Sequence, residues 1–305
     1  MRRVLLALVV LAIVAGAIFW FITAPKTVSA SALGPHTADL DNGRTMFLAG
    51  GCASCHASPN QEDRTRLGGG MPLKTPFGTF YPPNISPDPK DGIGAWSEAN
   101  FVTAMWMGTS PDGSHYYPVF PYTSYQRMQL DDVRDLFAFL KTLPPVAGKA
   151  QAHDLPMYLR FRRVLGGWKF LFLDDQRFAP DPAQSAQWNR GAYLVNGPGH
   201  CAECHSPRNL LGAIVDRQRL TGGPDPQGDE GRVPNITQAG IGDYSGGDIE
   251  QVLATGDTPS GDSVGGPMRD VVRNTRELTP EDRKAMAAYV KSLPPLEGQK
   301  PPERK

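Results

Sequence analysis

A long apolar segment opens the chain and differs from everything that follows it. Residues 4–24 carry no charged side chain, and Arg2 and Arg3 precede them. A helix of that length rises about 30 Å, which matches the hydrocarbon core of a bilayer. We therefore predict a membrane anchor over residues 1–27, with the two arginines on the cytoplasmic side and the rest of the chain outside. A cleaved signal peptide is the alternative, because Ala30-Ser31-Ala32 resembles a cleavage site, but the apolar segment is longer than signal peptides usually carry.

Beyond the anchor, two segments show the spacing of helices with one buried face. Their apolar side chains recur with the period of an α-helix at Val133, Leu136, Phe137 and Leu140, and at Met286, Tyr289, Val290 and Leu293. The second segment starts at the N-cap Thr279, and both end at a Leu-Pro-Pro sequence that cannot continue a helix. Shorter helices are predicted over residues 39–50, 97–107, 184–196 and 246–254.

The chain repeats itself after 147 to 151 residues. The paired stretches are Asn42-Gly43-Arg44 with Asn189-Arg190-Gly191, Pro83-Asn84-Ile85-Ser86 with Pro234-Asn235-Ile236-Thr237, Gly92-Ile93-Gly94 with Gly240-Ile241-Gly242, and Leu143-Pro144-Pro145 with Leu293-Pro294-Pro295. Each copy has a short helix, a long loop rich in glycine and proline, and a closing helix. We therefore predict a duplicated domain, over residues 35–146 and 184–297.

The stretch between the two copies, residues 147–183, contains an amphipathic segment. Leu155 to Phe172 is apolar and aromatic with a cationic face. We expect a connecting helix that packs across both domains. The alternative is an interfacial helix that lies on the membrane or against a partner protein.

Composition and charge narrow the class of protein. The 305 residues include 31 basic and 31 acidic side chains, so the net charge does not indicate a positive electrostatic field that would attract nucleic acid. The 33 glycines and 29 prolines predict loop-rich domains. A domain of about 110 residues with so many loops builds a small apolar core of its own, and a large apolar cofactor would complete it.

All four cysteines fall in two Cys-X-X-Cys-His strings, Cys52 to His56 and Cys201 to His205. This spacing is typical of covalent haem c attachment, in which both thiols bond to one haem and the histidine binds its iron as proximal ligand. Redox dithiols, zinc sites and structural disulfides also use paired cysteines. A zinc site would require the two pairs, 149 positions apart, to converge on one metal, and structural disulfides would leave the trailing histidines unexplained.

The strings therefore predict two covalently bound haem c groups. One is held by Cys52, Cys55 and His56, and the other by Cys201, Cys204 and His205. A closing helix that packs on the first helix, with haem between them, is the cytochrome c arrangement. The predicted fold is all-α, with two tandem, loop-rich cytochrome c domains after an N-terminal transmembrane helix.

An electron-transferring haem usually has a second axial ligand, and methionine raises its potential. Met268, after a Gly-Gly-Pro turn, is the candidate for the second haem, whereas Met286 on the closing helix is expected in the core. In the repeat, Phe120 occupies the position that Met268 has in the second copy, and phenylalanine cannot bind iron. Met128 is therefore the predicted iron ligand of the first haem.

Several weaker candidates for the first haem remain. Met105 and Met107 fall in a predicted helix and are expected in the core. His115 lies in a polar turn and is expected to be solvated, and Met71 lies in the long loop. His200, directly before Cys201, is expected beside the haem edge and not on its iron.

Longer stretches of the chain match a known pattern. Residues 75–80, 83–88, 92–96, 117–125 and 130–145 resemble the membrane-bound cytochrome c subunits of periplasmic alcohol, aldehyde and sugar-acid dehydrogenases. The likeness covers about 35–296. Those subunits usually carry three haem domains where this chain has two, and their Tyr-Pro-X-Met-Pro-Tyr has Phe120 in place of the methionine. The resemblance implies electron transfer, with a periplasmic dehydrogenase subunit as partner.

Together these features predict a membrane-anchored dihaem c-type cytochrome in the bacterial inner membrane, with a single N-terminal anchor and its soluble body in the periplasm. It would relay electrons from a periplasmic dehydrogenase to the quinone pool or a terminal oxidase, without a catalytic acid, base or nucleophile. The alternative is a dihaem enzyme of the peroxidase or thiosulfate-oxidising type, in which Phe120 in place of a methionine makes the first haem unusual.

Overall fold

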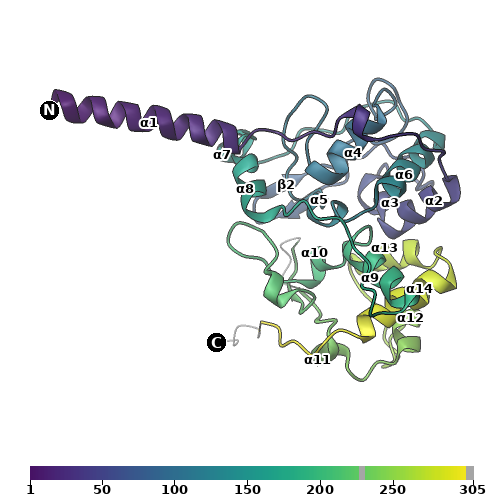
Figure 1. Cartoon of the computed structure of the whole chain (residues 1–305). Coiled ribbons are helices and arrows are strands. Elements are labelled where there is room, and N and C mark those ends of the chain that lie inside the picture. The colour runs from purple at the N-terminus through teal and green to yellow at the C-terminus, as the bar shows by residue number, and fades with distance from the viewer. Residues whose placement is uncertain (227–230, 300–305) are drawn as a thin grey trace.

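The computed structural model describes residues 1–226 and 231–299, and most of its regular structure is helical. Figure 1 shows two lobes, one from the first half of the chain (purple to teal) and one from the second (green to yellow), with α1 (Arg2–Ile22) projecting away from them. The predicted all-α class with two tandem domains is confirmed. The predicted second domain, 184–297, includes residues 227–230, which lie outside the described residues.

Both halves have the same order of elements. The first contains a 3-10 turn at Ala30–Ala32, α2 (Leu40–Ala49), α3 (Cys52–His56), α4 (Glu98–Met107), α5 (Tyr122–Tyr125) and α6 (Leu130–Thr142). The second contains α9 (Ala186–Asn196), α10 (Ala202–His205), a 3-10 turn at Asp216–Gln218, α11 (Gln238–Ile241), α12 (Gly246–Thr255), α13 (Met268–Thr275) and α14 (Pro280–Lys291). Helices α2, α4, α9 and α12 agree with the ranges predicted from the sequence, whereas α5 and α13 were not predicted.

Strands are few in the described part of the chain. β1 (Leu73–Thr75) pairs antiparallel with β2 (Gly78–Phe80), and β3 (Gly223–Pro224) pairs antiparallel with β4 (Arg232–Val233). Each pair ties together the long loop of its half. The loops that surround the predicted haem sites are therefore ordered mainly by turns and side-chain hydrogen bonds.

The first and last helices of each half cross in direct contact, as predicted. On α2, a Cβ added to Gly43 would lie 2.2 Å from the carbonyl oxygen of Asp135 on α6. On α9, a Cβ added to Gly191 would lie 1.9 Å from the carbonyl oxygen of Ala285 on α14. Glycine at these two equivalent positions lets the helix backbones touch, which explains one of the repeated sequence stretches.

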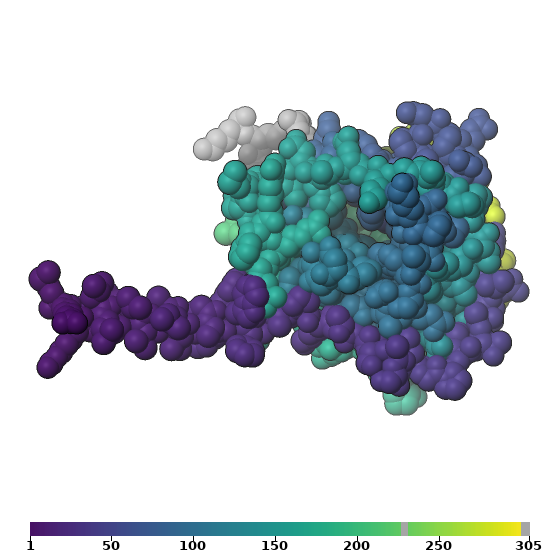
Figure 2. Space-filling model, turned by 90° about the horizontal axis from the view of Figure 1, so that it is seen from above, coloured from purple at the N-terminus to yellow at the C-terminus, as the bar shows by residue number. Residues whose placement is uncertain are grey.

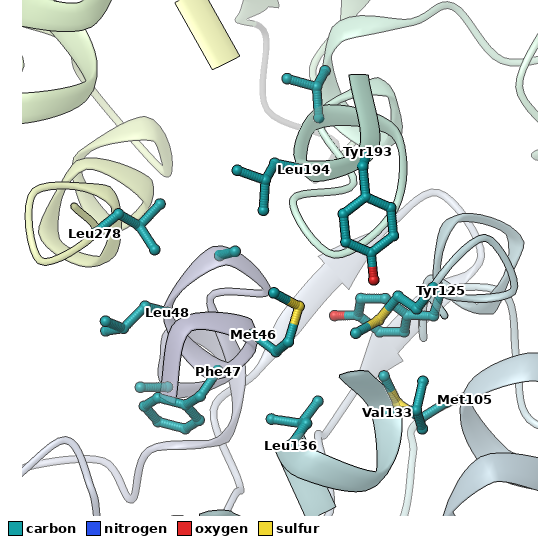
Figure 3. Close-up of a cluster of buried hydrophobic side chains, with 14 of the residues drawn as sticks. Met46, Phe47, Leu48, Met105, Tyr125, Val133, Leu136, Tyr193, Leu194 and Leu278 are labelled. Carbon is teal, nitrogen blue, oxygen red and sulfur yellow. The ribbon is translucent and has the colours of Figure 1, made fainter. Parts of the chain in front are cut away.

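One apolar core runs through both halves. Figure 3 shows Met46 and Tyr125 from the first half in the same cluster as Tyr193 and Leu194 from the second. Met286 lies in this core, as expected from its place on α14. The two halves therefore share one core and pack as one body.

The connecting segment packs on both halves, but it forms two helices where one was expected. These are α7 (Met157–Arg160) and α8 (Val164–Phe172). From α8, Lys169 Nζ donates to the carbonyl oxygen of Met107 at 2.6 Å, and Trp168 Nε1 donates to that of Leu211 at 2.9 Å. The expected connection across both domains is thus confirmed.

The end of α1 is joined to α8 through Thr23, which is only 1% exposed. The Thr23 hydroxyl accepts from Arg163 Nε at 2.9 Å, and its carbonyl oxygen accepts from His115 Nε2 at 2.9 Å. A Cβ on Gly166 would lie 2.5 Å from the same carbonyl oxygen. The prediction that His115 is solvated was wrong, because this junction buries its ring.

Helix α1 is itself exposed along its whole length, and Figure 2 shows it leaving the body beside the teal segment that contains α8. By length and composition it is the one helix among the described residues that could cross a membrane.

The helix crossings lead to a stability prediction. We expect Gly191→Ala to lower the free energy of unfolding of the haem-loaded protein by about 1–3 kcal/mol, because the added methyl group overpacks the crossing of α9 and α14. The matched control is Gly246→Ala at the start of α12, where a Cβ would meet nothing within 4 Å. Denaturant unfolding followed by circular dichroism compares them, and equal midpoints would contradict the close crossing.

Candidate haem sites

Each Cys-X-X-Cys-His string forms a single helical turn directly after the first helix of its half. The chain reverses just before it, at Gly51 with φ 56° and at His200 with φ 39°. The turn brings the two cysteines to neighbouring positions on one side. None of the four cysteines is in a disulfide, and no group of three or more His, Cys, Asp or Glu in the described residues could hold a metal ion. The two strings therefore do not converge on one zinc ion.

Both predicted proximal histidines are oriented by the same hydrogen bond. Nδ1 of His56 donates to the carbonyl oxygen of Pro83 at 2.8 Å, and Nδ1 of His205 donates to that of Pro234 at 2.9 Å. Because a carbonyl oxygen can only accept, Nδ1 carries the proton and Nε2 keeps its lone pair. Desolvation lowers the pKa of both imidazoles, which favours the neutral form that binds metals.

An asparagine holds the loop that carries each proline. Asn84 Oδ1 accepts from the Ser86 N–H at 2.9 Å, while Asn84 Nδ2 donates to the carbonyl oxygen of Val146 at 2.7 Å. In the second half, the same bonds join Asn235 to Thr237 at 2.8 Å and to Leu296 at 2.8 Å. The repeated Pro-Asn-Ile-Ser/Thr sequence therefore orients the histidine through the proline carbonyl.

The cysteine thiols complete the donor set. Desolvation raises the pKa of Cys55 and Cys201 to about 11 and that of Cys52 and Cys204 to about 12, so the free thiols are protonated. Two thiols on one turn and an imidazole with a free Nε2 fit a covalently attached haem c. When bound, haem supplies one-electron chemistry between ferric and ferrous iron.

Comparison with known families settles what these two sites are. A model of the cytochrome c family matches residues 40–144 and 188–294, and each range contains one string. The chain belongs to the cytochrome c family. As a dihaem cytochrome, it binds two haem c groups covalently, one in each half. Both matched ranges lie within the domains predicted over 35–146 and 184–297.

Curated relatives agree with two haems and electron transport. The chain is 48% identical over 304 residues to a "Diheme cytochrome c-type" protein of Cereibacter sphaeroides, covering 97% of this chain and 100% of that protein. It is 41% identical over 256 residues to a subunit of the nicotinate dehydrogenase of Pseudomonas putida, covering 84% of this chain and 21% of the relative. It is 35% identical over 267 residues to the fructose dehydrogenase cytochrome subunit of Gluconobacter japonicus, covering 85% and 53%. The chain thus spans only about half or less of these two dehydrogenase subunits.

The candidate sixth ligands lie in different surroundings. Met268 is the first residue of α13 and packs, partly exposed, against the apolar core. Met128 is 1% exposed, and its carbonyl oxygen accepts from Trp106 Nε1 at 3.1 Å. Met105 lies in the core as expected, whereas Met107 is partly exposed. The ligand roles of Met268 and Met128 stay predictions.

Each string also contacts the other half, which the sequence did not predict. Ser54, between the first two cysteines, accepts from Asn274 Nδ2 at 2.8 Å. Glu203, at the same place in the second string, accepts from Thr123 Oγ1 at 2.8 Å and Ser124 Oγ at 3.0 Å. Asn274 lies on α13 and the two hydroxyls lie on α5, so each half uses the helix that precedes its closing helix.

Glu203 brings a charge into this interface. Its side chain is largely buried, and Arg208 Nη2 donates to its Oε2 at 2.7 Å. Burial opposes ionisation, but Arg208 and the Thr123 hydroxyl hold the pKa of Glu203 below its ordinary value. An acid inside the string is visible in the sequence, but its partners lie about 80 residues earlier and no local pattern points to them.

The interface generates a second stability prediction. We expect Glu203→Gln to lower the free energy of unfolding by about 2–3 kcal/mol, because it leaves buried donors with a weaker acceptor. The control is Glu277→Gln, which removes an exposed ion pair with Arg44 (3.6 Å) between the same two halves and should cost under about 1 kcal/mol. Denaturant titration of both haem-loaded variants measures the difference, and a loss no larger than that of the control would exclude a structural role for the Glu203 contacts.

Proposed function

We propose that this cytochrome is a membrane-anchored electron carrier, which accepts electrons from a dehydrogenase outside the cytoplasmic membrane and passes them to the respiratory chain. The observation that carries the proposal is the pair of haem sites, alike on the side of their histidines, in one continuous core, each in hydrogen-bond contact with the other half. Two redox centres held in one body suit transfer from one haem to the other.

In this proposal the protein holds and orients the two haems, and it moves no proton. Cys52 and Cys55, and likewise Cys201 and Cys204, fix the haems covalently. His56 and His205 would bind iron through Nε2, while the proline carbonyls retain the Nδ1 protons. Met268 would supply the sixth ligand of the second haem. The apolar core packs against Cys52 and Cys201 and so supports one side of each site.

The proposed electron donor is a dehydrogenase subunit. Support comes from the relatives, which include cytochrome subunits of fructose, alcohol and gluconate dehydrogenases and a nicotinate dehydrogenase subunit. The proposed acceptor is the quinone pool or a terminal oxidase. No nucleic acid takes part, since the charges balance over the chain.

We further propose that α1 remains attached as an inner-membrane anchor, with the body in the periplasm. Cleavage after Ala32 would remove Thr23, whose carbonyl and hydroxyl are bonded to His115 and Arg163. Next to this junction, α7, α8 and the turn between them expose large apolar side chains, which suits contact with a bilayer surface: Met157, Tyr158, Phe161, Phe170 and Leu171.

Retention of the anchor has a direct test. Intact-mass analysis of the protein purified from membranes is expected to show residues 1–27 still attached, and the protein should resist extraction with carbonate. Recovery of a soluble protein whose first residue follows Ala32 would refute the anchor and favour the signal peptide.

Electron relay is tested in membranes of a strain that lacks this chain. Substrate-driven oxygen uptake through the partner dehydrogenase, identified by co-purification, is expected to be lost, while reduction of an artificial acceptor by that dehydrogenase remains. The full chain should restore oxygen uptake, and the C201S/C204S variant should not. Turnover of peroxide or thiosulfate by the purified cytochrome alone would favour the dihaem enzyme instead.

A further inference from the structure

The two halves differ at the position of the sixth iron ligand. Before that position their turns carry the same hydrogen bonds: the Tyr116 N–H donates to the carbonyl oxygen of Gly108 at 2.7 Å, and the Val264 N–H to that of Gly256 at 2.9 Å. Both glycines end a helix, α4 or α12, in the left-handed conformation. Counting on from this shared register of 148 residues places Phe120 where the second half has Met268. By Tyr125 and Thr275 the offset has grown to 150, so the second half has two additional residues after that position.

Aromatic rings surround Phe120. Its ring centroid lies 5.5 Å from that of Tyr116, 6.4 Å from that of Tyr122 and 5.5 Å from that of Tyr125. The side chain is therefore held in place by edge contacts with its neighbours. The first half has a packed aromatic cluster at the point where the second half presents a thioether.

Met128 corresponds to a different residue of the second half, Leu278. The Met128 N–H donates to the carbonyl oxygen of Tyr125 at 3.0 Å, and the Leu278 N–H donates to that of Thr275 at 3.1 Å. Each residue is buried and directly precedes the N-cap of the closing helix. The second half thus fills this position with a side chain that cannot bind iron, which indicates a packing role.

The contacts of Met128 agree with that role. Its Cγ lies 3.8 Å from the place of a Cβ on Gly197, so the side chain faces the other half of the molecule. The other two buried methionines of the first half follow the same rule, because the glycine registers pair Met46 with Leu194 and Met105 with Leu253.

Three candidates remain. Met107 ends α4 before Gly108, where Thr255 ends α12 before Gly256, so it corresponds to another residue that does not ligate a haem iron. Met71 follows Gly70, whose N–H donates to the carbonyl oxygen of Pro82 at 2.9 Å, beside the Pro83 carbonyl that orients His56. This places Met71 with the proximal loop and not with the opposite one. His115 is bonded to Thr23.

We propose that the iron of the first haem has no methionine ligand, and that its sixth position is open to a small diatomic ligand such as carbon monoxide. This replaces the assignment of Met128 made from the sequence. The inference deepens the proposed function and rests on it, since it concerns one of the two haems of the relay. Without a thioether the first haem also has the lower potential of the two.

Carbon monoxide titration of the reduced, full-length protein tests this inference by difference spectroscopy. The wild type is expected to bind one molecule per two haems. Met128→Leu, which conserves volume, should leave this ratio and the spectra unchanged. Met268→Leu should raise the binding to two molecules of carbon monoxide per two haems. Phe120→Met should abolish binding and add the absorption band of a methionine-ligated ferric haem, whereas Phe120→Leu should not.

Two results would overturn the inference: no carbon monoxide binding by the wild type, or a new binding site created by Met128→Leu. Haem content and reduction by the dehydrogenase are measured on the same preparations. Two haems reduced normally but without carbon monoxide binding would refute the open site and leave the electron relay standing. Binding to one haem without reduction by the dehydrogenase would support the open site and count against the relay.

Discussion

The hydrogen bond from each proximal imidazole to a proline carbonyl is the interaction on which both sites depend. It leaves Nε2 of each imidazole with a free lone pair, and it joins the Cys-X-X-Cys-His turn to a loop about 28 residues further along the chain. The asparagine after each proline then connects that loop to the chain beyond the closing helix. A single contact thus links the cofactor, the loop and the helical crossing in each half.

Local sequence signals predicted the elements that local chemistry controls. The N-cap Thr279 and the haem strings depend on residues close together in the chain, and each was visible as a local pattern. Several contacts between distant segments are not visible as a local sequence pattern. The bond from His115 to Thr23 spans 92 residues and that from Asn274 to Ser54 spans 220, so neither burial of His115 nor the contact between halves could be inferred.

The proposed inequality of the two haems would give the proposed relay a direction. If Met268 binds the second iron while the first has no thioether, the second haem is the stronger electron acceptor, and electrons that enter at the first haem move downhill to the second. Glu203, inside the second string, is paired with Arg208, so the buried carboxylate brings its own compensating charge.

One pair of contacts between the halves is reciprocal. Ser54 and Glu203 occupy the same position of their strings, and Asn274 and Ser124 occupy the same position before their closing helices. At these positions each half gives the other the contact that it receives, as the two copies do in an isologous interface. Other contacts have lost this equivalence: Tyr193 donates to Asp132 of the first half, whereas its counterpart Thr45 donates to Asp41 within its own half. The connecting segment holds the two copies together in one chain, which frees each of them to diverge.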